Sequence, residues 1–315
     1  MKRLTFTLLS LLFATAVMAQ QAAEVMVIGH RGGRAEFEEN TLAAFKGSFE
    51  KGVRGYETDI RMTADEELVI THDASLKRMT GVDIDVEKST RKEIKKIKTK
   101  QGNPILFLDE LVKYFRGSDI AYIEWEMKSN NYTEEQLKVY CDKAYKTVMK
   151  DKPENALYIF SSFDHRSIRT MKQLHPDAEC MLITGDPANE KTLKTAEELG
   201  VKRIACNVDG TSRKMVKAAH KAGYKVNLWP GTSEEDFQLA LSLGADIACT
   251  DYPVRILQFV KEKMPTGLSV INSYANLNHD DIRIEVLFSN LTNVEIHIDI
   301  NRGEIYFKET ENGRK

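Results

Sequence analysis

One layout recurs three times in the second half of the chain: AEELGVKRIAC at residues 196–206, AHKAGYKVNLW at residues 219–229 and ALSLGADIACT at residues 240–250. In each, a helical pattern stops at a glycine, and an apolar, strand-like run starts about two residues later. Glycine is a common helix stop, and loops of this length are usual between a helix and a following strand. The three stretches therefore predict successive helix–loop–strand units.

The same alternation extends outward over most of the chain. Strand-like runs are predicted at residues 25–28, 55–60, 121–127, 156–160, 179–184, 201–206, 224–229 and 246–249. A helical pattern follows each run, from residues 41–51 after the first to residues 254–263 after the last, and Asn40 is expected to cap the first helix. Eight such units over about 240 residues predict an α/β fold, a closed (β/α)8 TIM barrel rather than an open doubly wound sheet.

Two segments depart from this alternation. Residues 61–108 are expected to form a loop elaboration after the second strand, with a hairpin turn at residues 63–67, a strand at residues 68–71 and a solvated Lys-rich surface at residues 91–100. The tail alternates apolar and polar residues with period two at residues 284–288, 296–300 and 305–307, with a turn at residues 301–303. We therefore expect a TIM-barrel domain at residues 24–264 and a small C-terminal β appendage at residues 265–315, without which the chemistry can proceed.

Composition limits the possible functions. The chain has 315 residues, of which 42% are hydrophobic and 29% charged, as in ordinary globular proteins. Its net charge is −2, so it lacks the excess of basic residues that is typical of nucleic-acid-binding proteins. Its four cysteines form no C-x-x-C pair, which argues against a zinc ribbon or thioredoxin-like chemistry. Export would permit disulfides, but Cys206 and Cys249 lie in apolar strand-like runs, and we interpret the cysteines as buried free thiols.

The first nineteen residues are typical of a cleaved secretory signal peptide. Lys2 and Arg3 precede an apolar run that ends near Val17, and small residues lead up to Ala19. The run is shorter than the roughly 20 residues that span a bilayer, so no transmembrane segment is expected in the mature chain. We predict cleavage near Ala19 and a periplasmic or secreted protein.

Polar residues gather where the predicted strands end. They are Gly29-His-Arg-Gly-Gly33 after the first strand, Glu57 and Asp59 on the second, His72-Asp73 in the elaboration, Glu124, Glu126 and Lys128 on the third, Ser161-Ser162-Phe163 after the fourth, Trp229 on the seventh, and Thr250-Asp251 after the eighth. In an α/β barrel these ends meet on one face, which is where the active site lies.

Acidic residues that alternate within apolar strands are costly to bury without a counter-charge. A divalent cation held by Glu57, Asp59 and Glu126 would supply one, and carboxylate ligands favour Mg²⁺ or Ca²⁺ over zinc. The alternative is a structural network in which Arg31, Arg61 and Lys128 neutralise the acids.

An ordered set of motifs is similar to the glycerophosphodiester phosphodiesterase family. The matching segments are Gly29-His-Arg-Gly-Gly33 with Glu39-Asn-Thr-Leu-Ala-Ala-Phe45, YETDIRMTADEELVITHD at residues 56–73, Glu126-Met-Lys-Ser129, and residues 224–236 and 244–253. The resemblance covers about residues 25–262 and does not reach the tail. One departure is Glu38, which stands where most members have proline.

The resemblance implies roles for individual residues. By similarity, His30 and His72 are the catalytic pair, Glu57, Asp59 and Glu126 are the metal ligands, Arg31 and Lys128 contact the phosphate, and Trp229 lines the glycerol end of the substrate. Glu124 is the rival third ligand, but the family's Glu-x-Lys spacing selects Glu126. The implied reaction is metal-dependent hydrolysis of a small-molecule glycerophosphodiester to glycerol 3-phosphate and an alcohol.

Two histidines suit such a reaction, because one can take a proton from the attacking hydroxyl while the other gives one to the leaving alkoxide. Two other functions remain open at this point. A phospholipase D-like or C-like phosphodiesterase of the same barrel group would act on lysophospholipids, and a binding protein would keep the barrel without turnover. Head-group preference and oligomeric state do not follow from the sequence.

Overall fold

A computed structural model describes residues 25–262, 268–277, 282–290, 295–299 and 306–310. Residues 25–262 form one compact unit. The predicted signal peptide and the predicted turn at residues 301–303 lie outside the described residues. Within the described residues, no helix combines the length and the apolar character needed to cross a bilayer.

The compact unit is a closed barrel of parallel strands, as predicted. Its strands are β1 (Met26–His30), β2 (Gly55–Met62), β4 (Tyr122–Met127), β5 (Leu157–Ser162), β6 (Cys180–Ile183), β7 (Arg203–Asn207), β8 (Lys225–Trp229) and β9 (Ile247–Thr250). Each strand pairs in parallel with the next, and β1 closes the ring by pairing with both β2 and β9. All eight predicted strands are therefore confirmed, with small differences at their ends.

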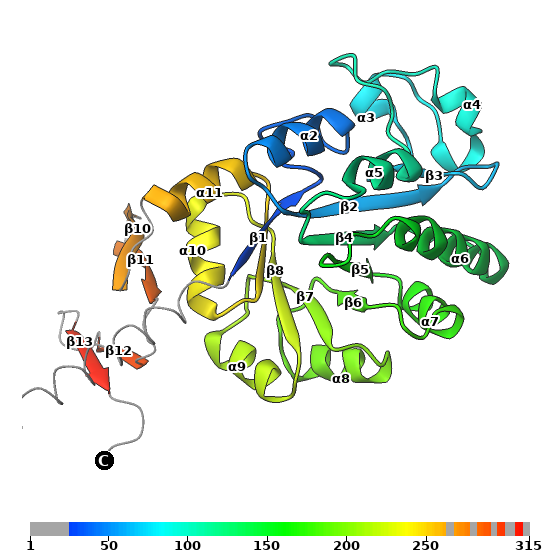
Figure 1. The fold of residues 1–315 in the computed structure, drawn as a ribbon. Helices are drawn as coiled ribbons and strands as arrows, with labels where there is room; N and C mark the ends of the chain where they lie inside the picture. Colours follow the sequence, from blue (N-terminus) through cyan, green and yellow to red (C-terminus); the bar gives the residue numbers. More distant parts are fainter. Residues whose placement is uncertain (1–24, 263–267, 278–281, 291–294, 300–305, 311–315) are drawn as a thin grey trace, which may run out of the picture. The chain divides into compact units, whose positions relative to one another are not determined.

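A helix follows each barrel strand, and Figure 1 shows the helices outside the strands. They are α2 (Leu42–Glu50), α5 (Leu108–Phe115), α6 (Glu134–Lys150), α7 (His165–Leu174), α8 (Glu190–Glu198), α9 (Arg213–Lys221), α10 (Glu234–Leu243) and α11 (Pro253–Glu262). The glycines expected to end helices all have positive φ, including Gly244, which caps α10. Helix α5 shows why these segments pack on the strands, since it buries Leu111, Val112 and Phe115 along one side.

The predicted elaboration after β2 is confirmed. Strand β3 (Leu68–Ile70) pairs antiparallel with β2 across a turn in which the Thr63 N–H donates to the Glu67 carbonyl. Three short helices follow: α3 (Lys77–Thr80), the 3-10 helix η1 (Val86–Lys88) and α4 (Arg91–Ile94). They enclose a small apolar core of their own, so the elaboration is a packed substructure rather than an open loop.

The described part of the tail consists of strands, as predicted. Strands β10 (Leu268–Leu277) and β11 (Ile282–Asn290) form one antiparallel pair, and β12 (Glu295–Asp299) and β13 (Tyr306–Thr310) form another. Strand β10 was not among the predicted segments.

The barrel interior holds an apolar core and a group of buried acids. Ile28, Tyr122, Ile159 and Met181 belong to the buried core, whereas Glu57, Asp59 and Glu126 are buried farther along their strands. The four cysteines are free thiols, as interpreted, but only Cys141, Cys180 and Cys206 are buried, whereas Cys249 is partly buried. Burial raises the pKa of Cys206 to about 12.

Candidate active site

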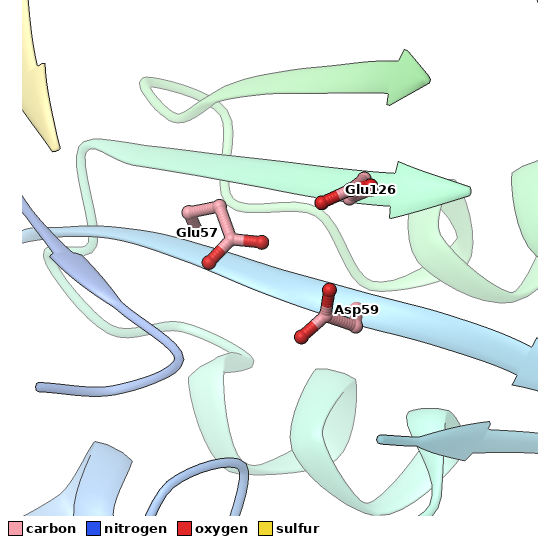
Figure 2. Close-up of side chains that lie close together, drawn as sticks. All are labelled: Glu57, Asp59 and Glu126. Carbon is pink, nitrogen blue, oxygen red and sulfur yellow. The ribbon is translucent and has the colours of Figure 1, made fainter. Parts of the chain in front are cut away.

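Three carboxylates meet inside the barrel where β2 and β4 lie side by side (Figure 2). Asp59 on β2 is in register with Glu126 on β4, and Glu57 lies two residues before Asp59, so all three side chains point to the interior. One oxygen of each lies within 4.8 Å of the others. Their exposed fractions are 5%, 0% and 8% for Glu57, Asp59 and Glu126 respectively.

Two basic side chains stand against this acid cluster of Glu57, Asp59 and Glu126. Lys128 Nζ lies 2.6 Å from Glu126 Oε1 and 3.2 Å from Asp59 Oδ1, and Arg31 Nε lies 3.4 Å from Asp59 Oδ2. Burial alone would raise the pKa of Asp59, but Lys128 and Arg31 together lower it. Asp59 is therefore the carboxylate of the cluster that stays ionised.

The other carboxyls of the cluster behave differently. Burial and the neighbouring charges of Asp59 and Glu126 raise the pKa of Glu57 well above its ordinary value. Burial also raises the pKa of Glu126 to about 7, although Lys128 opposes this shift. Glu57 Oε1 is buried and accepts no hydrogen bond from any described residue. The protein's own cations therefore leave part of the negative charge uncompensated.

These residues fit a hard divalent cation. Three carboxylates supply the oxygen ligands that Mg²⁺ and Ca²⁺ prefer, and a dication would keep Glu57 and Glu126 ionised despite their burial. Arg61 takes no part in neutralising the cluster, since its Nε donates to the His72 carbonyl and its Nη1 to Glu87. The alternative prediction, in which Arg31, Arg61 and Lys128 neutralise the acids, is therefore wrong for Arg61. Arg31 and Lys128 do pair with the acids.

His30 lies at the end of β1, beside the acid cluster. Its Nδ1 lies 2.6 Å from Asp251 Oδ1, and its Nε2 lies 3.7 Å from Glu57 Oε2. Asp251 is held in turn by Arg34, whose Nε lies 2.8 Å from its second oxygen. When Nδ1 carries the proton and donates it to Asp251, Nε2 is left free to exchange a proton in the cavity.

His72 has the same kind of support from the elaboration. Its Nδ1 lies 2.7 Å from Asp73 Oδ1, and Arg78 Nε lies 2.6 Å from Asp73 Oδ2. Arg78 also contacts both oxygens of Glu39. Burial is the main reason that the pKa of His72 is lowered, although the charge of Asp59 acts in the opposite direction.

Asp73 and Asp251 were expected at the rim of the barrel, but no role was predicted for either. Asp73 is the next residue after His72, and that adjacency is a signal that sequence reasoning could have used. Asp251 is 221 residues from His30, and no local pattern links the two.

The candidate residues border one cavity of about 240 Å³. Its charged lining residues include His30, Arg31, Glu57, His72, Glu126 and Lys128, and its largely apolar ones include Phe163, Ile183, Ala205, Leu228, Trp229, Pro230 and Cys249. Asp59 is buried behind this wall. Trp229, the apolar residue predicted for the site, lines this cavity, and its ring packs edge-on against Phe163 with centroids 5.8 Å apart. Sequence reasoning placed Phe163 at a strand end without a role, and it is 43% exposed at this cavity.

Asn40 is not the helix cap that was expected. Thr41 caps α2, because its side chain accepts from the N–H of Ala44. Asn40 itself has a φ of 55°, which asparagine tolerates better than most residues. Its Nδ2 donates to Asp59 Oδ2 at 2.8 Å, and its Oδ1 accepts from Thr58 Oγ1 at 2.9 Å. Asn40 therefore positions the ionised carboxylate of the cluster.

We expect Asn40→Gly to lower kcat/KM and the melting temperature, because Thr58 and Asp59 each lose a buried hydrogen-bond partner while the backbone keeps its left-handed conformation. A loss of about 2 kcal/mol would lower Tm by roughly 4–8 °C in a domain of this size. Asn40→Ala should melt lower still, since it adds backbone strain. Wild-type melting and turnover in Asn40→Gly would show that the side chain does not hold Asp59 in place.

Glu38, the departure from the motif, has a structural contact in the elaboration. Its Oε2 accepts hydrogen bonds from Thr99 Oγ1 at 2.5 Å and Asn103 Nδ2 at 2.7 Å. The glutamate therefore ties the loop after β1 to the elaboration that carries His72.

Comparison with known proteins agrees with this architecture. The model of the glycerophosphoryl diester phosphodiesterase family matches residues 30–255. A protein of Caldanaerobacter subterraneus named glycerophosphodiester phosphodiesterase is 27% identical over 248 residues, covering 76% of this chain and 99% of the relative. A human protein named lysophospholipase D GDPD1 is 26% identical over 279 residues, covering 74% of this chain and 85% of the relative. The structure of an Oleispira antarctica phosphodiesterase in complex with sn-glycerol-3-phosphate superposes with a TM-score of 0.69 at 22% identity, covering 75% of this chain and 97% of the other.

Proposed function

This chain belongs to the glycerophosphoryl diester phosphodiesterase family, and from that premise we propose how its own residues cleave a glycerophosphodiester into glycerol 3-phosphate and an alcohol. The observation that carries the proposal is one cavity in which His30 and His72, each anchored through Nδ1 on an aspartate, face three buried carboxylates. Groups that transfer protons and groups that hold charge are thus within reach of one bound phosphodiester.

Charge neutralisation comes first. Arg31 and Lys128 line the cavity beside the acid cluster and offset the negative charge of the phosphodiester. Glu57, Asp59 and Glu126 would hold a divalent cation, Mg²⁺ or Ca²⁺, which when bound supplies further positive charge at the phosphate oxygens.

Proton transfer is assigned to the two histidines. The lowered pKa of His72 favours its neutral form, in which Nε2 accepts the proton of the attacking hydroxyl as the new P–O bond forms. His30 donates the proton on Nε2 to the oxygen of the departing alcohol as the old P–O bond breaks. Asp73 and Asp251 keep Nδ1 of each ring engaged, so that Nε2 is the nitrogen exposed to substrate.

The direct test is to identify the products from glycerophosphocholine. We expect equal amounts of glycerol 3-phosphate and choline, because the phosphate is retained on the glycerol fragment. Release of phosphocholine and glycerol would instead show phospholipase C-like cleavage. If neither pair forms under any metal condition, the binding-protein interpretation replaces the enzymatic one.

A second candidate substrate is a lysophospholipid. The apolar side of the cavity, with Phe163 43% exposed at Trp229, supports this candidate. One relative is also named a lysophospholipase D. Lysophosphatidylcholine compared with glycerophosphocholine at matched concentrations separates the two substrates.

A further inference from the structure

A group of buried polar side chains inside the barrel takes no part in the steps above. Glu124 Oε1 accepts a hydrogen bond from Ser161 Oγ at 2.9 Å, and Glu124 Oε2 accepts one from Asn227 Nδ2 at 3.4 Å. The exposed fractions of Glu124, Ser161 and Asn227 are 4%, 0% and 2%. Glu124 and Asn227 also line the 240 Å³ cavity. These three residues are called the polar floor below.

Two members of the polar floor, Glu124 and Asn227, lie one layer deeper in the barrel than Glu126 and Trp229. Glu124 precedes Glu126 by two residues on β4, and Asn227 precedes Trp229 by two residues on β8, so each points inward one layer nearer the N-terminal ends of the strands. Asn227 is in register with Ala205, which is in register with Ile183, and both of these apolar residues also line the cavity. The deep end of the cavity therefore combines aliphatic walls with polar groups.

One acceptor of the polar floor is unpaired. Asn227 Nδ2 lies 3.4 Å from Glu124 Oε2 and 3.3 Å from the Tyr122 hydroxyl. Asn227 Oδ1 is buried and accepts no hydrogen bond from any residue that the structure describes. Trp229 Nε1 is also buried, and it donates to none of these residues. Buried polar atoms normally have a partner, so an unpaired acceptor in a cavity wall indicates a ligand group.

We propose that the polar floor recognises the terminal hydroxyl of the substrate's glycerol, with Asn227 Oδ1 accepting its proton and Glu124 holding Asn227 in place. This inference rests on the proposed function. The terminal hydroxyl is the glycerol group farthest from the phosphate, and it would reach past Glu126 to Asn227, with the carbon chain along Ile183 and Ala205. An acyl chain on that hydroxyl would run into the buried side chain of Tyr122, whose hydroxyl lies 3.3 Å from Asn227 Nδ2, so the polar floor selects deacylated glycerophosphodiesters over 1-acyl lysophospholipids.

The test compares kcat/KM for glycerophosphocholine, its analogue with hydrogen in place of the terminal hydroxyl, and 1-acyl lysophosphatidylcholine. We expect the wild type to prefer glycerophosphocholine to the deoxy analogue by roughly 10²-fold or more, since a site built to bond a hydroxyl rejects the compound that lacks it. Leucine is close to asparagine in shape. Asn227→Leu should therefore reduce kcat/KM for glycerophosphocholine by about 10- to 100-fold, while kcat/KM for the deoxy analogue should stay within about 3-fold of the wild-type value. The preference itself should therefore collapse.

Two further variants keep the comparison decisive. Glu124→Gln preserves the shape of the side chain and should weaken the preference less than Asn227→Leu does, and it supplies the comparison if Asn227→Leu does not fold. Asn207→Ala is the matched control: Asn207 ends the neighbouring strand β7, accepts from the Asp209 N–H and lies outside the cavity wall, so its preference should equal that of the wild type.

The outcomes separate this inference from the proposed function. If the wild type does not cleave glycerophosphocholine, the proposed function is wrong. If the wild type cleaves it and Asn227→Leu or Glu124→Gln keeps the full preference over the deoxy analogue, the role of the polar floor is overturned. A wild type that cleaves lysophosphatidylcholine as fast as glycerophosphocholine overturns the selection against acylated substrates.

Discussion

We expect His30→Ala and His72→Ala each to lower kcat by roughly 10²–10⁴-fold, the usual contribution of general acid–base catalysis. The loss arises from proton transfer, because the carboxylates of the acid cluster and not the histidines would bind the cation. Metal affinity and melting temperature should therefore stay close to those of the wild type. The double variant should lose much less than the product of the two single losses, since residues that act as a unit are not additive.

The pH profile assigns the two roles. Burial lowers the pKa of His72, so the acidic limb of kcat/KM should lie below pH 6.5, the value of an ordinary imidazole. As the pH falls through this limb, His72 becomes protonated and can no longer accept a proton. His72→Ala should lose the acidic limb, and His30→Ala should keep it.

His220→Ala serves as the control, because His220 lies on α9 and pairs with Asp246 outside the cavity wall. It should turn over at close to the wild-type rate. Turnover near the wild-type level in either His30→Ala or His72→Ala would refute the acid–base assignment.

Removal of divalent cations should have the second large effect. We expect an excess of chelator to reduce kcat by about 10³-fold or more, since charge stabilisation by a bound cation amounts to several kcal/mol in the transition state. Addition of Mg²⁺ or Ca²⁺ should restore activity. Asp59→Asn should show the same loss, and added metal should not rescue it.

A measurement independent of turnover accompanies this prediction. A cation that binds the folded protein raises its melting temperature by mass action, so titration with Mg²⁺ or Ca²⁺ should stabilise the wild type and not Asp59→Asn. Asp186→Asn, at an acid that pairs with Lys191 away from the cavity, should respond as the wild type does. Full activity in excess chelator, with no bound metal detected, would contradict the assignment.

Local sequence pattern determined the barrel itself. Apolar runs alternate along the chain with amphipathic stretches that end at glycines. This pattern predicts parallel strands covered by helices, and the eight predicted strands form the ring. Because parallel strands share one direction, the residues at their C-terminal ends had to meet on one face. That is why His30, Glu57, Asp59, Glu126 and Trp229 could be grouped before any geometry was known.

The chemical environment of these residues depended on contacts between strands far apart in the chain. β1 pairs with β9 as the ring closes, with Gly29 in register with Thr250, and this brings Asp251 against His30 across 221 residues. Asn40 shows the same limit at closer range. An asparagine directly before a helix is typical of an N-cap. In the folded barrel, β2 lies next to Asn40, and the side chain of Asn40 donates to Asp59 instead.

Glu124 and Glu126 could not be separated by chemistry alone, since both are glutamates on one face of one strand. The structure distinguishes them by the neighbours that each meets. Glu126 lies beside Asp59 and Lys128, whereas Glu124 lies one layer deeper beside Ser161 and Asn227. The sequence of a strand determines its side-chain types and which of them share a face. Its neighbours on the adjacent strands depend on the strand register and on closure of the ring, which only the complete barrel determines.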